Sequence, residues 1–427
     1  MRVIVALIIT FVGILASFFN AIYGLIAYAF WSYTHPENVT WGLLPMGRLS
    51  YAVGLTLVIT TVLQKKKLFS GNPKVVFIIM FWILCLIGVV TAGSTELSSW
   101  QFQYFTRVIM ITLIMTVLID DIKKFKYYIW AMVIFIGLVA AQSGIRGTLI
   151  GEVGGAESGF AGVLGERNFT AVFLCSIIPI VFYSGNAEKS KKLKLLLRGI
   201  LLGDILALIL TYSRAGFLGM AATGLFAFIK AKRKILTGMT SFVILFILIN
   251  FFIPHEYIDR LHTMKKVDIK QEDVDMSAAA RLIAWRSAIE MIKDRPLTGV
   301  GFYNAEAAIG DYQDPETGIS LAGLAIHNTL LQVGAELGLP ALILYIFLFF
   351  IIYRTLGRIR RKVRLNKLNE EMSKYALMLQ ISFVGFFVSA FFVNAAFIDI
   401  SWHLAGLTIA LEQIVNKELE RPAPQTG

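Results

Sequence analysis

Apolar runs of about 20 residues, the length at which a helix crosses the hydrocarbon core of a bilayer, recur along the whole chain. Backbone polar groups find no water inside a bilayer, so such runs form helices whose hydrogen bonds are internal. The runs lie at residues 3–33, 48–63, 74–92, 100–118, 125–142, 161–183, 194–211, 214–229, 234–252, 327–353, 373–396 and 400–415. They predict an all-α polytopic membrane protein with about 12 transmembrane helices. The first run is long enough for one tilted or broken helix, or for two short ones.

The composition agrees with a membrane protein and excludes several other classes. Hydrophobic residues make up 57% of the chain and charged residues 16%, whereas a soluble domain has roughly 45–50% apolar and about 25% charged residues. A soluble enzyme, a disordered chain and a disulfide scaffold are thereby excluded. Cys85 and Cys175 both lie in apolar runs, and no histidines have the spacing of a metal site. We therefore expect no metal and no cofactor.

The net charge of +12 would suggest a nucleic-acid partner in a soluble protein, but here it indicates orientation. The basic clusters lie at Lys65–Lys67, Lys123–Lys126, Lys189–Arg198, Lys230–Lys234 and Arg354–Lys374. With one span in the first run, all of them fall on one side of the membrane, which the positive-inside rule assigns to the cytoplasm. We therefore expect both termini in the cytoplasm and no nucleic-acid partner. Two spans in the first run would move only the N-terminus.

A long loop on the outer side, residues 253–326, separates the last two groups of runs. Loops of this length are usually functional. The loop divides the chain into an N-terminal transmembrane bundle at 1–252, the loop itself at 253–326, and C-terminal transmembrane helices at 327–427.

The loop contains the signal of an amphipathic helix. Leu282, Trp285, Ile289 and Ile292 recur at helical spacing, which predicts a helix with one apolar face. Ser277 can cap its start. Its end is marked by Pro296, and the chain then turns at Gly299-Val-Gly301.

Three arginines are candidates for binding an anion. Arg214 lies in the short outer turn Thr211-Tyr-Ser-Arg-Ala-Gly216, where a charge is costly and usually functional, although an arginine can also snorkel to the interface. Arg281 begins the loop helix, where a solvated helix face is the alternative. Arg167 and Asn168 lie where a Gly-rich loop enters a span. Free N–H groups at such a helix start can bind an anion, or the residues there can simply cap the helix.

His327 opens the apolar run that follows the loop, so it is expected at the outer membrane interface. Imidazole titrates near neutral pH and can accept a proton from a hydroxyl; a capping or interfacial histidine is the alternative. Glu336 lies further along the same helix, on a different face and too far for a direct pair with His327. We expect it to have a structural role near a helix break at Gly338–Pro340. Asp204 lies within a span and has no evident partner, so a role in proton relay is open.

Several motifs, in this order, resemble the O-antigen ligase/polymerase superfamily. They are Tyr212-Ser-Arg214-Ala-Gly between two spans, Arg281-x-x-x-Trp285 with Pro296-Leu-Thr-Gly-Val-Gly301 after it, and His327-Asn328 followed by Glu336-x-Gly338. The start, Trp31-Ser-Tyr-Thr-His-Pro36 to Gly42, and Ile145-Arg-Gly147 resemble a branch described as O-glycosylation ligases associated with exosortase systems. The resemblance covers nearly the whole chain, because span number, loop position and motif order agree.

The resemblance implies a metal-independent, inverting glycosyltransferase of the GT-C type in the bacterial inner membrane, with its site facing the periplasm. Such enzymes take a glycan from undecaprenyl pyrophosphate and pass it to an acceptor hydroxyl on a lipid or protein. The residues it assigns are Arg214, Arg281 and Arg167 for binding pyrophosphate, His327 for the general base, and Asn328, Glu336 and Trp285 in supporting positions. The implied partners are the lipid-linked glycan donor, the acceptor and the membrane lipids.

Elementary chemistry agrees with these roles. A pyrophosphate leaving group gathers negative charge, which arginine forks stabilise without a metal, and an acceptor hydroxyl needs a base. A polymerase that extends the lipid-linked chain would use the same residues as a ligase. Two further alternatives are a transporter, which would have matching halves and broken helices, and a membrane scaffold, in which Arg214, Arg281 and His327 could be replaced freely.

Overall fold

The computed structural model describes residues 2–34, 47–150, 166–231, 278–316, 318 and 322–420. These residues form helices and connections and contain no strand. Within these residues, six helices are long and apolar enough to cross a membrane. They are Pro73–Val90, Thr95–Leu118, Ile122–Leu149, Arg167–Ala187, Thr329–Leu365 and Glu370–Ala390. The all-α class is confirmed, and the helices are consistent with a polytopic membrane protein. The total of about 12 spans stays a prediction, and the run at 234–252 lies outside the described residues.

The first apolar run forms two helices, α1 (Arg2–Phe19) and α2 (Ala21–Thr34), which are separated at Asn20. The Asn20 side chain accepts a hydrogen bond from the Ile22 amide at 3.2 Å. Gln64, just after α4 (Gly47–Leu63), accepts one from the Ala21 amide at 3.0 Å. These side chains bond backbone groups that the break leaves without helical partners.

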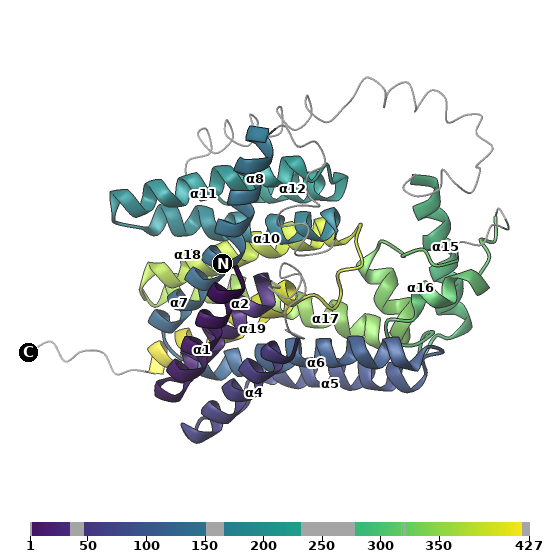
Figure 1. The fold of residues 1–427 in the computed structure, drawn as a ribbon, viewed down its shortest axis with the longest axis horizontal. Helices are drawn as coiled ribbons and strands as arrows, with labels where there is room; N and C mark the ends of the chain where they lie inside the picture. The colour runs from purple at the N-terminus through teal and green to yellow at the C-terminus, as the bar shows by residue number, and fades with distance from the viewer. Residues whose placement is uncertain are drawn as a thin grey trace, which may run out of the picture.

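The other long helices are α5 (Pro73–Val90), α6 (Thr95–Leu118), α7 (Ile122–Met132) continued by the π-helix η1 (Val133–Leu138) and α8 (Val139–Ile150), then α10 (Arg167–Ala187), α11 (Lys191–Leu210), α12 (Arg214–Lys230), α17 (Thr329–Leu365), α18 (Glu370–Ala390) and α19 (Asp399–Glu420). Most of them lie roughly along one axis, whereas α7 and α8 are steeply inclined to it (Figure 1). Helix α18 packs against α10, α12 and α17, and α17 packs also against α5 and α19. The core therefore brings N-terminal and C-terminal helices together.

Several basic connections meet at one end of the bundle. Lys66, after α4, forms an ion pair with Asp120 at 2.9 Å, and Lys126 in α7 forms one with Glu371 at 2.7 Å. Lys362, near the end of α17, donates to Asn416 of α19 at 2.8 Å. This is the end where α19 runs to the C-terminus, whereas α15 (Ala278–Asp294) and α16 (Ala305–Ala308) lie at the opposite end (Figure 1).

Helix α15 is the helix predicted in the outer loop, and two of the four residues on its predicted apolar face, Trp285 and Ile292, pack against a buried cluster. Ile283, Ala288 and Met291 are buried, whereas Leu282 and Ile289 are 47% and 41% exposed. The buried face of α15 packs against α17 and lies to one side of the predicted face. Ser277, the predicted cap, lies outside the described residues.

The segment after α15 pairs with a break in α17. Gly338 has non-helical angles, φ 79° and ψ 176°, and Pro340 has no N–H to bond the carbonyl of Glu336. The Val300 and Gly301 amides donate instead to the carbonyls of Ala335 and Glu336, at 2.8 and 3.0 Å. The carbonyls of Ala335 and Glu336 therefore keep hydrogen-bond partners in spite of the break.

Gly301 is required by this pairing. Its φ is 111°, and a Cβ placed on it would lie 2.3 Å from the Cα of Ala92. Its successor Phe302 donates from its amide to the carbonyl of Gly88 at 2.9 Å. The motif therefore joins the outer segment to α5 as well as to α17.

Two residues of the N-terminal Trp31-Ser-Tyr33 motif belong to a buried polar network. Ser32 donates to the carboxylate of Asp399 at the start of α19, and the Tyr33 hydroxyl lies 2.6 Å from Nδ1 of His403. Both tyrosine and histidine are fully buried. The network joins α2 to α19, so the second and the last of the described helices are linked by polar contacts.

Candidate functional site

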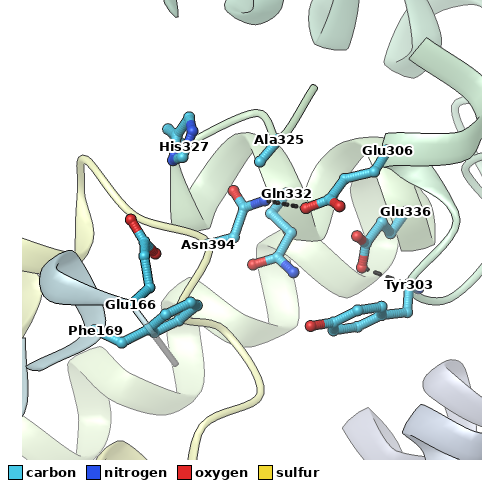
Figure 2. Close-up of a pocket in the computed structure, with 9 residues that line it drawn as sticks. All are labelled: Glu166, Phe169, Tyr303, Glu306, Ala325, His327, Gln332, Glu336 and Asn394. Atoms are coloured by element: carbon cyan, nitrogen blue, oxygen red, sulfur yellow. Dashed lines mark hydrogen bonds between the residues drawn. The ribbon is translucent and has the colours of Figure 1, made fainter. Parts of the chain in front are cut away.

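A cavity of about 110 Å³ lies where the α15–α16 segment meets the N-terminal ends of α10 and α17. Figure 2 shows the residues that line it: Glu166, Phe169, Tyr303, Glu306, Ala325, His327, Gln332, Glu336 and Asn394. Carboxylates, amides, an imidazole and a phenol form most of this lining. The cavity therefore offers many hydrogen-bonding groups and few apolar ones.

His327 lies just before the N-terminal end of α17, as its position in the sequence predicts. It is half-buried and has a φ of 52°, in a region that non-glycine residues rarely adopt. Burial and the nearby charge of Arg281 lower the pKa of the imidazole below its usual value, while the Glu166 carboxylate opposes this shift. The imidazole is therefore neutral at neutral pH, the form that can accept a proton.

Asn328 caps α17. Its Oδ1 accepts from the amides of Leu330 and Leu331 at 2.9 and 3.0 Å, and its own amide donates to Asn394 Oδ1 at 3.3 Å. Thr329 Oγ1 is bonded to the Ala390 carbonyl at 2.7 Å. The helix start that carries His327 is thus fixed to the connection between α18 and α19.

Trp285 fixes the backbone on the N-terminal side of His327. Its indole Nε1 donates to the carbonyl of Ile326 at 3.0 Å, and its ring packs edge-on against Phe391 with centroids 5.7 Å apart. Since Ile326 immediately precedes His327, the tryptophan positions the backbone of the histidine without lining the cavity.

The three predicted arginines gather beside this cavity, although none of them is among its lining residues. Arg281 is half-buried. Burial and the positive charges of Arg214 and Arg167 lower its pKa, and the Glu166 carboxylate acts in the opposite direction. The three guanidinium groups are therefore within electrostatic range of one another. They reach this position from the starts of α10, α12 and α15.

Ser213 and Asn168 join two of these helix starts. Ser213 caps α12 by accepting from the Gly216 amide at 3.2 Å, and it donates to Asn168 Oδ1 at 2.8 Å. The Asn168 amide in turn donates to the Glu166 carboxylate. Asn168 and Ser213 are 4% and 1% exposed, so these contacts are shielded from solvent.

Glu336 lines the same cavity as His327 but bonds elsewhere. Its Oε2 accepts from the backbone amide of Tyr303 at 3.1 Å. Tyr303 has a φ of 54°, so the buried carboxylate holds a backbone conformation that tyrosine disfavours. No direct contact between Glu336 and His327 is recorded in the described chain, in agreement with their expected separation.

Five polar lining residues were not predicted: Glu166, Tyr303, Glu306, Gln332 and Asn394. Asn394 donates to Glu306 at 3.5 Å (Figure 2). Burial raises the pKa of the Glu306 carboxyl, and the charge of Glu166 adds to that effect. Tyr303 and Glu306 directly follow the Gly299-Val-Gly301 turn, and that turn was the one signal that could have pointed to them.

Unusual backbone angles concentrate around the cavity. Among the described residues, five that are not glycine have a positive φ: Lys65, Tyr212, Tyr303, His327 and Lys367. Tyr303 and His327 line the cavity, and Tyr212 immediately precedes Ser213-Arg214. Strained residues of this kind gather at functional sites, which supports this cavity as the candidate site.

Other charged residues considered from the sequence do not line the cavity. Arg286 forms ion pairs with Asp314 at 3.6 Å and Glu316 at 2.6 Å, so it stabilises the loop after η4 (Ile309–Asp311). Asp204 is buried in α11, and its carboxylate finds no hydrogen-bond partner in the described chain. It lies near Gly137 of η1.

Comparison with known proteins gives two family matches. Residues 199–346 match the family described as O-Antigen ligase, and residues 1–189 match a family of unknown function, DUF5935. No curated protein matches the chain. The first match confirms the resemblance to the O-antigen ligase superfamily, and neither match confirms the exosortase-associated branch. Arg214, Arg281 and His327 lie in the first matched region, and Arg167 lies in the second.

Proposed function

We propose, from the O-antigen ligase domain at residues 199–346, that this protein is a membrane glycosyltransferase. It moves a glycan from undecaprenyl pyrophosphate to an acceptor hydroxyl on a lipid or a protein. The observation that carries the proposal is the meeting of three arginines with a neutral histidine at one cavity. A transporter or a scaffold has no need of that combination.

The arginines bind the leaving group. As the bond between the anomeric carbon and the phosphate oxygen breaks, negative charge develops on the pyrophosphate. Guanidinium groups stay ionised and bind phosphate oxygens in a planar fork. Arg214 and Arg281, with Arg167 as a third contact, stabilise the charge of the transition state.

His327 acts on the acceptor. Its imidazole removes the hydroxyl proton as the acceptor oxygen attacks the anomeric carbon on the side opposite the pyrophosphate. This attack inverts the anomeric configuration. A base placed in this way accelerates transfer by about 10²–10⁴-fold.

We place the protein in the bacterial inner membrane, with the cavity facing the periplasm. Support comes from the basic connections at the end of the bundle opposite α15 and α16, because basic connections favour the cytoplasmic side. The lipid-linked donor then reaches the arginines from the outer leaflet.

The test supplies the purified protein with a lipid-linked oligosaccharide and candidate acceptors, and follows where the sugar goes. We expect sugar on a second lipid or a protein, which is the ligase reaction. Longer chains on the original lipid carrier would identify the polymerase of the same superfamily. Absence of transfer under every acceptor condition, in protein that binds the donor, would contradict the proposal.

Transfer is expected to persist in EDTA, because arginines rather than a metal ion neutralise the pyrophosphate. The measurement compares initial rates with and without the chelator at fixed donor concentration. Rates within about twofold of each other would agree with the mechanism. A loss of activity that added divalent ions restore would show that a metal takes part.

A further inference from the structure

Glu166 is a carboxylate without a role in the mechanism above, although it lines the cavity together with His327. In Figure 2 its carboxylate is turned toward the side of the cavity where His327 lies. An acidic residue beside arginines that bind pyrophosphate would weaken donor binding. Its presence there calls for another role. The inference below rests on the proposed function, since it concerns the same base.

The Glu166 carboxylate is not used to cap α10. Glu166 occupies the residue before α10 with φ −153° and ψ 139°, and its side chain makes no capping hydrogen bond. Instead it accepts a hydrogen bond from Asn168, and Asn168 is fixed by Ser213 at 2.8 Å. Two buried polar side chains, Asn168 and Ser213, thus fix the carboxylate beside the helix start.

The other two cavity carboxylates have partners of their own. Glu336 accepts from the Tyr303 amide at 3.1 Å, and Glu306 accepts from the Asn394 amide at 3.5 Å. The remaining charged groups around His327 are the arginines at the starts of α10, α12 and α15, and Arg281 opposes a positive charge on the imidazole. Glu166 is therefore the carboxylate placed to favour that charge.

We propose that Glu166, held by Asn168 and Ser213, is the positioning residue of His327. When the acceptor proton moves to the imidazole, the resulting imidazolium shares the cavity with the Glu166 carboxylate, which stabilises it. The proton remains on His327 until solvent removes it. The same carboxylate offsets the repulsion between the imidazolium and the arginines.

The experiment measures kcat, the donor KM and the pH profile of kcat/KM for Glu166→Gln. Wild-type kcat/KM should fall at low pH with a midpoint below the usual histidine value of about 6.5, because His327 is then protonated. In Glu166→Gln we expect kcat to drop about 10- to 100-fold and the donor KM not to rise. The midpoint should move down by about one pH unit, because an opposite charge has been removed from the imidazole.

Two variants control this result. Glu166→Asp keeps the charge, so the midpoint should stay close to the wild-type value even where the shorter side chain lowers kcat. Glu306→Gln removes a cavity carboxylate whose charge does not act on His327, and its midpoint should also stay in place. A third variant keeps the inference testable where Glu166→Gln is poorly folded. Asn168→Ala removes the side chain that holds Glu166, so it should shift the midpoint in the same direction as Glu166→Gln.

The pairing and the proposed function fail in different ways. An unchanged kcat and an unchanged midpoint in folded Glu166→Gln would overturn the pairing alone, provided that His327→Ala is inactive in the same assay. Full activity in His327→Ala would overturn the role of His327 as base, and the pairing with it.

Discussion

Replacing His327 by alanine is expected to reduce glycan transfer by about 10²–10⁴-fold, the rate that a general base contributes. The half-buried imidazole has a lowered pKa, so at neutral pH it is free to accept the acceptor proton. Glu336 and Asn328 offer no replacement, since both are engaged in bonds to backbone amides. The measurement is the initial rate of product formation with purified protein and lipid-linked donor.

Two further measurements separate a lost base from a lost fold. The variant should elute and melt as the wild type does, because Trp285 and Asn394 hold the backbone on both sides of His327. Free imidazole added to the assay should restore part of the rate, because it can enter the space left by the side chain. A wild-type rate in the alanine variant would show that the histidine is only a structural residue of the interface.

Arg214→Lys is expected to lower kcat by about 10- to 100-fold, although the charge is retained. A lysine ammonium is a point charge and cannot hold two phosphate oxygens in a planar fork. Ser213 caps α12 immediately before Arg214, so the helix start should stay intact and the loss should reflect the side chain itself. The measurement is the rate at saturating donor, together with the donor KM.

A matched control is available on α15. Arg286 is an arginine of α15 that pairs with Asp314 and Glu316 and lies away from the cavity arginines. Arg286→Lys preserves those ion pairs and is expected to keep the wild-type rate. Wild-type activity in Arg214→Lys would instead favour an arginine that snorkels to the membrane interface.

The all-α class, and the candidate arginines and histidine of the site, could be predicted from the sequence for a simple reason. Apolar runs, short charged turns and an interfacial histidine are local features, and the cost of charge in a membrane gives them meaning. Glu166 and Asn394 could not be found in this way, because their role depends on three-dimensional contacts with segments far away in the chain. Nothing in the residues around Asn394 signals that it bonds both Asn328 and Glu306.

The face of α15 shows a second limit. Residue spacing predicted the helix correctly, but Leu282 and Ile289 of the predicted face are exposed, whereas Ala284 and Ala288 are buried. Periodicity reports which residues share a face, whereas the partner helix decides which face is covered. The break between α1 and α2 at Asn20 was likewise open from the sequence alone, because a long apolar run fits either arrangement.

The break at Gly338 also divides α17 into two parts that are held by different neighbours. Outside it, the short segment that starts at His327 is bonded to the Pro296–Gly301 turn and to the connection after α18. Inside it, the long remainder of α17 packs among α5, α18 and α19. Helices adapt to bilayers of different thickness by tilting. A tilt of the inner part that is absorbed at Gly338 would leave the position of His327 unchanged in membranes of different thickness.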